Sequence, residues 1–246
     1  MASNRDLWLE SFDRNNIPAL PCPSCRVGRL ALDDETYSWR RLGTSDQFHS
    51  KFGYTPEEDY GRFVCQLVCS NGYCREVISV AGDTEELLTA VSDDGNRYDT
   101  ILYPKIMLPG PPLMDIPEGT PVLAVEAIKQ AFNAFWGDRG SAANRLRISV
   151  ERIMDAHGIP KQDGGKDLKL FRRIELFGEQ NADSKDMLDA LRHVGNLGSH
   201  DGDVSREALL DAFEIYQEWL RNFYGKYPNR MRALTERLIA TKGRYG

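Results

Sequence analysis

Apolar side chains recur at a helical spacing throughout the second half of the chain. Val122, Val125, Ile128 and Phe132 follow one another at intervals of three or four residues, which places them on one face of a helix over residues 120–135. Further stretches with this spacing are residues 141–156, 167–177, 184–198, and a last one that opens at 205 and is interrupted near 227. We therefore expect a bundle of four or five helices.

The first half has a different pattern, in which short apolar runs alternate with turn residues. A short helix is expected first, over residues 4–15. The β-like runs that follow it are residues 29–32, 36–42, 63–68, 77–80 and 98–104. This pattern predicts a small antiparallel β module.

Five prolines between residues 104 and 117 separate the two patterns. Because proline at this density disfavours regular structure, the segment is expected to be a linker. We therefore predict a β module with a short N-terminal helix over residues 1–108, a proline-rich linker over 109–118 and a helical bundle over 119–246. The expected fold class is α+β.

The composition is that of an ordinary globular protein, with 41% hydrophobic and 28% charged residues among 246. No run approaches the roughly 18 to 20 apolar residues of a membrane span, and the first residues do not form a signal-peptide core. We expect a cytoplasmic protein that is not bound to a membrane.

Charge is divided unevenly along the chain. Residues 1–118 hold 11 Lys and Arg against 19 Asp and Glu, whereas residues 221–246 hold seven basic side chains and one acidic side chain. This basic terminus has two interpretations: it contacts phosphate, or it is a solvated helical face with a frayed end.

The five cysteines are arranged in a way that favours metal binding over disulfides in a reducing compartment. Cys22 and Cys25 form one hook, and Cys69 and Cys74 form a second, each followed by a β-like run as in a zinc ribbon. Cys65 lies four residues before Cys69 and is expected on the same face, buried near the site. Four cysteine ligands leave no open position for water, so the predicted Zn²⁺ is structural. The alternative is a set of free, reduced cysteines in a β core.

The segment 190–200 carries the chemically capable side chains of the helical half. Arg192, Asn196 and His200 follow one another at intervals of four residues, which is one side of a helix. Histidine can transfer a proton near neutral pH, and Arg or Asn donors can stabilise a phosphate. Alternatively, His200 caps the end of the helix or is exposed to solvent.

Three segments carry a resemblance to a known family: residues 142–151, residues 191–200 with Gly-Asn-Leu-Gly-Ser-His at their end, and residues 204–208. Over about residues 113–225 the chain resembles the bacterial family called domain of unknown function 4145. That family looks like a branch of the HEPN helical superfamily (higher eukaryote and prokaryote nucleotide-binding), and its members often carry a zinc-ribbon-like segment in front. The resemblance implies a helical bundle that forms homodimers and takes part in RNA processing, toxin-antitoxin or antiviral defence systems.

In HEPN nucleases the motif is an arginine, four to six residues that begin with a polar one, and a histidine. Asn196 and His200 match the polar residue and the histidine, but Gly195 stands at the arginine position. The leading hypothesis is therefore a zinc-binding protein that binds RNA or a protein partner without cleaving RNA. The alternative is a metal-independent endoribonuclease in which His200 transfers the proton, Arg192 stabilises phosphate and Asn196 positions the substrate.

Overall fold

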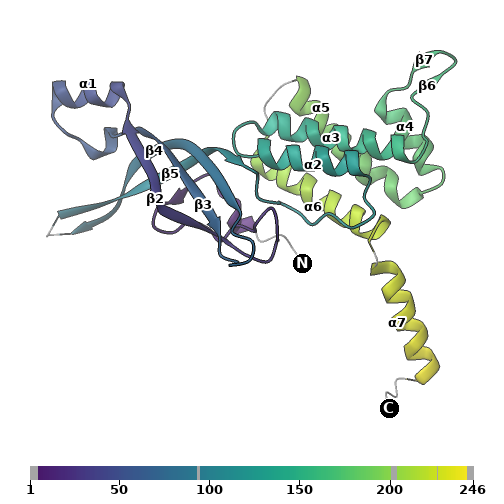
Figure 1. The fold of residues 1–246 in the computed structure, drawn as a ribbon. Helices are drawn as coiled ribbons and strands as arrows, with labels where there is room; N and C mark the ends of the chain where they lie inside the picture. The colour runs from purple at the N-terminus through teal and green to yellow at the C-terminus, as the bar shows by residue number, and fades with distance from the viewer. Residues whose placement is uncertain (1–4, 93–94, 201–203, 226, 243–246) are drawn as a thin grey trace. The chain divides into compact units, whose positions relative to one another are not determined.

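The computed structural model describes residues 5–92, 95–200, 204–225 and 227–242, and the side chains of residues 92, 200 and 227–229 lie outside this description. The chain divides into two compact units. The first contains residues 1–112 together with 132–142, and the second contains residues 113–131 and 143–246 (Figure 1). A mixed α+β chain, with an antiparallel sheet followed by helices, is confirmed.

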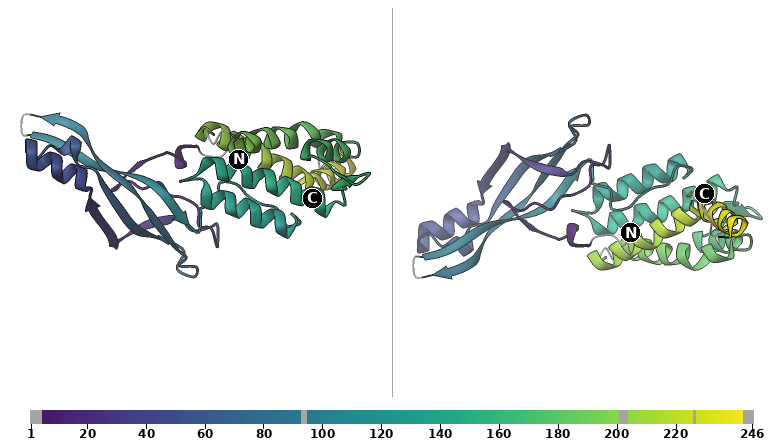
Figure 2. Two further views of the ribbon diagram at one scale, coloured as in Figure 1. Left: turned by 90° about the horizontal axis from the view of Figure 1, so that it is seen from above. Right: turned by 90° about the horizontal axis from the view of Figure 1, so that it is seen from below.

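The first unit is built on a five-stranded antiparallel sheet with the strand order β1-β5-β4-β3-β2. The β4–β5 pair forms a long hairpin, which Figures 1 and 2 show as the most extended part of the sheet. The strands are β1 (Phe12–Asp13), β2 (Leu30–Arg41), β3 (Gly61–Cys69), β4 (Val77–Ser92) and β5 (Gly95–Leu108).

The alternation of side chains along β3 shows why this sequence forms a sheet with one buried face. Cys65 pairs with Val80, and Val80 pairs with Met107, and all three side chains are buried. The next residue on each strand points to the other face. There Val64 and Ile106, which both pair with Ala81, are 53% and 55% exposed. The period of two that the sequence shows in 63–68 therefore separates a core face from an open face.

A helical insertion between β2 and β3 was not predicted. It consists of α1 (Gly43–Phe52) and the 3₁₀ turn η2 (Pro56–Glu58), and Tyr98 of β5 donates a hydrogen bond to Glu57 at 2.6 Å. Ser45 is the one buried residue of α1, so the helix carries no apolar stripe by which periodicity could reveal it. The insertion is anchored instead by polar contacts, chiefly the paired hydrogen bonds from Arg41 to the buried carboxylate of Asp59 at 2.6 and 2.8 Å.

The predicted N-terminal helix over residues 4–15 is wrong. The segment has a 3₁₀ turn, η1 (Arg5–Leu7), and then β1, in which Phe12 pairs with Leu102 of β5. Trp8 and Phe12 are buried, and their rings lie 6.1 to 6.4 Å from those of Phe135 and Trp136. Apolar residues at roughly helical spacing here serve aromatic packing within the first unit, so tertiary contacts override the local pattern.

Most of the second unit is helical, as the periodicity predicts. The helices of the second half of the chain are α2 (Val122–Ala134), α3 (Arg139–Ala156), α4 (Leu170–Gly178), α5 (Lys185–His200), α6 (Arg206–Phe223) and α7 (Tyr227–Thr241). A small hairpin, β6 (Gln162–Asp163) with β7 (Lys166–Asp167), precedes α4, and a 3₁₀ turn, η3 (Ala182–Ser184), precedes α5.

Two of these helices have capping contacts at one end. Gly158 has φ +70°, the left-handed conformation expected of a glycine after α3, and the N–H of Ile159 reaches back to the carbonyl of Met154 at 3.0 Å. Ser205 caps α6 by accepting a hydrogen bond from the N–H of Ala208 at 3.2 Å. The prolines of residues 109–117 lie in a stretch that forms neither helix nor strand.

Candidate metal centre and polar helix face

The two cysteine hooks come together at one end of the sheet. The first lies in the loop before β2, and the second connects β3 to β4. Ser70 joins them, since its N–H donates to the carbonyl of Arg29 at 2.8 Å and its hydroxyl accepts from the N–H of Arg29 at 3.0 Å. As a result, four sulfur atoms lie within 4.8 Å of one another, those of Cys22, Cys25, Cys69 and Cys74.

The spacing of these sulfur atoms fits a tetrahedral metal. The Sγ atoms of Cys22 and Cys74 are 3.7 Å apart, and so are those of Cys25 and Cys69. Four sulfurs at about 2.3 Å from a Zn²⁺ ion would be separated by about 3.8 Å in a regular tetrahedron. Each close pair combines one cysteine from each hook, so a metal held here would cross-link the two hooks.

Backbone and amide N–H groups point at the sulfur atoms. Gly28 N–H donates to Cys25 Sγ at 3.3 Å, and Asn71 donates through its backbone N–H to Cys69 Sγ at 3.4 Å and through its side chain to Cys25 Sγ at 3.7 Å. The Gly28 hydrogen bond lowers the pKa of Cys25 to about 6, whereas burial raises the pKa of Cys69 despite the hydrogen bond from Asn71. Such donors stabilise thiolate, which is the form that binds metal.

Gly28 is required by the geometry of the cluster. A Cβ atom at this position would lie 2.2 Å from Cys69 Sγ and 3.0 Å from the Cβ of Asn71. Any side chain at Gly28 would therefore displace a sulfur of the cluster. Sequence reasoning missed this contact, because the contact depends on the second hook.

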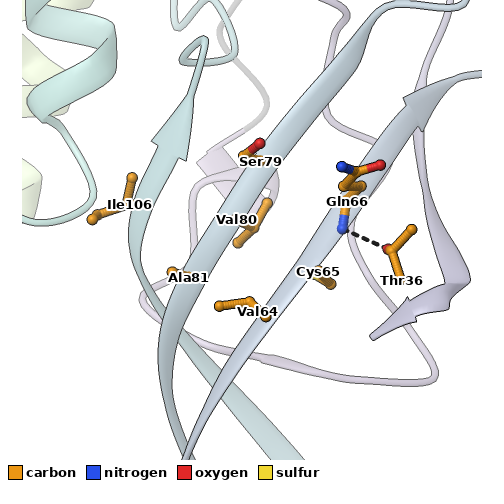
Figure 3. Close-up of a pocket in the computed structure, with 8 residues that line it drawn as sticks. All are labelled: Thr36, Val64, Cys65, Gln66, Ser79, Val80, Ala81 and Ile106. Atoms are coloured by element: carbon orange, nitrogen blue, oxygen red, sulfur yellow. Dashed lines mark hydrogen bonds between the residues drawn. The ribbon is translucent and has the colours of Figure 1, made fainter. Parts of the chain in front are cut away.

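Cys65 does not join the cluster. It is buried on the same face of β3 as Cys69, as expected, but Cys69 lies four positions further along the strand, about 13 Å away. Burial raises the pKa of Cys65 to about 11, so its thiol is neutral. Cys65 lines a cavity of about 270 Å³. Figure 3 shows the residues around it, which are Thr36, Val64, Cys65, Gln66, Ser79, Val80, Ala81 and Ile106.

On α5, the guanidinium of Arg192 makes hydrogen bonds with neighbouring side chains. Its Nε donates to Asp189 Oδ1 at 2.6 Å, and its Nη2 lies 2.8 Å from Nε2 of His193, which must accept because a guanidinium only donates. The guanidinium also lies 5.3 Å from the centre of the Phe171 ring, and the side chain is 15% exposed. The hydrogen bond from Arg192 holds the pKa of Asp189 below its usual value.

Gly195 of α5 lies against α3. A Cβ atom at Gly195 would lie 2.4 Å from the Cβ of Arg147 and 3.1 Å from the carbonyl oxygen of Ala143. The stem of Arg147 therefore fills the space that a side chain at 195 would need. The Arg147 guanidinium donates to Glu151 at 2.5 Å and to Asn144 at 3.1 Å. The sequence analysis did not predict that Arg147 of α3 lies next to α5.

The other predicted residues of this helix face have different surroundings. Asn196 is half-buried one turn after Arg192. The Ser199 hydroxyl lies 3.1 Å from Oδ1 of Asn144 and 2.9 Å from the carbonyl of Gly195, so the end of α5 also contacts α3. His200 is the last residue of α5, and its side chain lies outside the described residues.

The basic terminus includes a helix with mostly exposed side chains. Along α7, Arg230, Arg232 and Arg237 are exposed, and so are Leu238 and Ile239 at 45% and 72%. The other basic residues of the predicted segment are Arg221, Lys226, Lys242 and Arg244. Of these, Lys226 and Arg244 lie outside the described residues.

Two protein-family models each match part of the chain. Residues 129–241 match the family described as Domain of unknown function (DUF4145). This match confirms the family resemblance of the helical half, and it continues to residue 241, so that α7 is included. Residues 10–108 match a second family, Domain of unknown function (DUF8608), which was not foreseen and which contains both hooks. Neither the curated proteins nor the solved structures contain a match to this chain.

In the part of the chain that the structure describes, no helix is both long and apolar enough to cross a membrane.

Proposed function

We propose that the protein binds RNA, that a structural Zn²⁺ ion organises its zinc-ribbon-like β unit, and that its HEPN-like helical unit does not cleave the RNA. The observation that carries the zinc part is the convergence of four sulfur atoms, two from each hook, at tetrahedral spacing. The non-catalytic part is supported by the side chains around Arg192 and Gly195. The RNA part is supported by the exposed arginines of α7 and by the link to RNA processing that the family resemblance implies.

Zinc suits this donor set better than other common metals do. Four cysteine sulfurs at tetrahedral spacing are a typical structural zinc site, whereas Mg²⁺ and Ca²⁺ require oxygen ligands. A bound Zn²⁺ would stabilise the fold by linking the two hooks. It would not activate a water molecule, because the four sulfurs would fill its coordination shell. The residues that would hold it are Cys22, Cys25, Cys69 and Cys74, with Gly28 and Asn71 donating hydrogen bonds to the sulfur atoms.

The absence of cleavage is supported by what surrounds the residues predicted to act on phosphate. A phosphate-stabilising arginine has to direct its N–H groups at the substrate. Arg192 directs two of its nitrogens at Asp189 and His193 instead, and it is largely buried. Gly195 has no side chain, and Arg147 occupies the adjacent space while pairing with Glu151.

RNA binding is supported by the charge and exposure of α7. Arginine contacts with phosphate release counterions, so affinity should fall linearly on a logarithmic scale as salt rises. The test compares the full chain with a chain truncated after Gly225, using a fluorescent single-stranded RNA at several salt concentrations. Weaker binding and a smaller salt slope for the truncated chain would support the role of α7. Unchanged affinity and slope would show that α7 is merely solvated.

A ribonuclease remains the second candidate, because Asn196 and His200 match the polar residue and histidine of the nuclease motif. The discriminating experiment incubates the purified protein and His200→Ala with total RNA in the presence of a chelator. We expect no cleavage by either protein. Cleavage by the wild type that is lost in His200→Ala would establish the nuclease and refute our proposal, while equal cleavage by both would indicate contamination.

The proposal has three further elements: a homodimer formed through the helical unit and a role in antiviral defence or a toxin-antitoxin pair, both implied by the family resemblance, and a cytoplasmic location. The first is the most directly testable. Light scattering of the full chain should give about twice the mass of one chain, and a monomer at micromolar concentration would refute the dimer.

A further inference from the structure

Helix α7 carries a narrow apolar stripe. Met231, Leu234 and Leu238 follow one another at intervals of three and four residues, and Thr241 comes three residues later. At about 100° per residue, these four positions fall within an arc of about 80°. A helix that packs into a core presents a wider apolar face, of about 100° or more, whereas a seam at this spacing is typical of a coiled coil. The stripe therefore has the form of a surface that pairs with another helix.

The stripe is only partly covered within the described chain. Leu238 is 45% exposed, Met231 and Leu234 are half-buried, and no described residue from 230 to 242 is buried. A helix of 15 residues is marginal in water by itself, because helices gain most of their stability by packing an apolar face. A second helix that covers the stripe would therefore stabilise α7.

Basic side chains flank the stripe on both sides. Arg230 and Arg237 lie along one edge and Lys242 lies along the other, at the positions that set the choice of partner in a coiled coil. Residues 226–244 hold six basic side chains and one acidic side chain, that of Glu236. A second copy of α7 would bring like charges together along both edges, which disfavours pairing of α7 with itself. An acidic helix is complementary to both edges.

Contacts with RNA do not account for the stripe. Arginine and lysine side chains bind the phosphate backbone by themselves, and bases that stack on a protein stack on aromatic rings or guanidinium planes. Met231, Leu234 and Leu238 offer neither. The stripe therefore calls for a ligand that has an apolar surface of its own.

We propose that α7 docks an acidic amphipathic helix of a partner protein, and that this helix displaces RNA from α7. The apolar side chains of the partner helix pack against Met231, Leu234 and Leu238, and its carboxylates lie beside Arg230 and Lys242, as in a coiled coil. Displacement follows because the carboxylates occupy the same basic side chains that contact phosphate. The displacement rests on the proposed function, that α7 binds RNA, whereas the docking does not.

The test measures the affinity of the full chain for a fluorescent synthetic helix of about three heptads, with leucine at its core positions and glutamate at its flanking positions. The wild type should bind this helix at micromolar concentration, and a chain truncated after Gly225 should not. Leu238→Ala should weaken binding about tenfold, because it removes an apolar side chain from the middle of the stripe. Alanine is the best helix former, so this substitution preserves α7 itself.

The matched control is the same kind of substitution at the next residue. Ile239 is 72% exposed, but it lies about 100° around the helix from Leu238 and outside the stripe. Ile239→Ala should bind the synthetic helix as the wild type does. An equal loss in the two variants, or no loss in either, would overturn the inference, because binding would not depend on the stripe.

Further probes separate an acidic helix from other occupants of the stripe. A synthetic helix with lysine at the flanking positions should not bind, and neither should an acidic helix with alanine at the core positions. Equal binding of the alanine-core helix would reduce the effect to net charge and overturn the inference. So would binding to phosphatidylserine vesicles without binding to the acidic helix, which would assign the stripe to a membrane surface. A dimer that becomes a monomer on truncation after Gly225 would assign the stripe to a second copy, which also overturns the inference.

Competition with RNA separates the inference from the proposed function. The acidic helix should release a fluorescent single-stranded RNA from the wild type, and Leu238→Ala should keep its RNA affinity because its basic side chains remain. Simultaneous binding of RNA and the acidic helix would overturn the displacement. If the acidic helix binds and RNA does not, the proposed RNA binding fails and the docking stands. If RNA binds and the acidic helix does not at about 100 μM, the inference fails and RNA binding stands.

Discussion

The cysteine cluster and the polar face of α5 both consist of residues with chemical capability at regular spacing, yet their surroundings differ. At the cluster, the neighbours direct N–H groups toward the sulfur atoms and leave a tetrahedral arrangement of donors. On α5, the neighbours engage the candidate itself, since Asp189, His193 and Phe171 surround Arg192. The comparison shows that spacing identifies candidate residues and that neighbouring contacts decide whether they remain available to a ligand.

The largest effect is expected from losing the metal ligands. Cys22→Ser, or a strong chelator, should unfold the β unit, because structural zinc sites supply on the order of 10 kcal/mol to folding. The helical unit should keep its structure, so circular dichroism at 222 nm should change little while near-ultraviolet signals of the β unit are lost. Cys65→Ser is the control, and it should retain zinc. Loss of zinc in Cys65→Ser would contradict the ligand set.

A smaller effect should follow from crowding the cluster without removing a ligand. Gly28→Ala places a Cβ atom against Cys69 Sγ, and overpacking of this kind costs about 1–3 kcal/mol. The variant should release zinc at a lower chelator concentration than the wild type. Gly72→Ala in the second hook is the matched control, since a Cβ there meets nothing within 4 Å. Equal zinc retention in both variants would show that the cluster binds zinc even when Cys69 Sγ is displaced.

The same kind of substitution tests the helical unit. Gly195→Ala brings a Cβ atom against Arg147, and it should destabilise the chain by about 1–3 kcal/mol in urea unfolding. Leu197→Ala, two residues later at a position that is 40% exposed, should stay within about 0.5 kcal/mol of the wild type. If Gly195→Ala is as stable as the wild type, α3 and α5 are not as close as described, and a side chain at 195 could be accommodated.

The smallest effect concerns the ion pair of Arg192. Because the folded-state pKa of Asp189 is depressed below 3.8, the pair stabilises the chain above that pH and its contribution is lost as pH falls through the folded pKa. Arg192→Gln should therefore lower stability at pH 7 by less than about 1 kcal/mol. The difference from the wild type should shrink in acid, below pH 3.8. A difference that is constant from pH 7 to pH 2 would mean that Arg192 acts through packing alone.

Several features could be predicted from the sequence because their causes are local. The helices of the second half follow from apolar periodicity, and the four cysteines follow from two short spacings that turns bring together. The α+β class follows from the contrast between the two halves.

Other features depend on contacts between distant segments, and for that reason the sequence alone did not reveal them. Trp8 and Phe12 have a helix-like spacing but pack against Phe135 and Trp136, more than 120 residues away. The helix α1 buries no apolar stripe and is anchored through the Arg41 and Asp59 pair. Arg147 fills the space beside Gly195 only because α3 and α5 pack closely.

The central claim, that the four cysteines of the two hooks bind a structural zinc ion, is tested most directly by X-ray absorption at the zinc edge together with metal analysis of the purified chain. The account predicts one zinc per chain with four sulfur neighbours at about 2.3 Å and no nitrogen or oxygen neighbour. Well under one zinc per chain, or a coordination shell that includes oxygen from water, would contradict it.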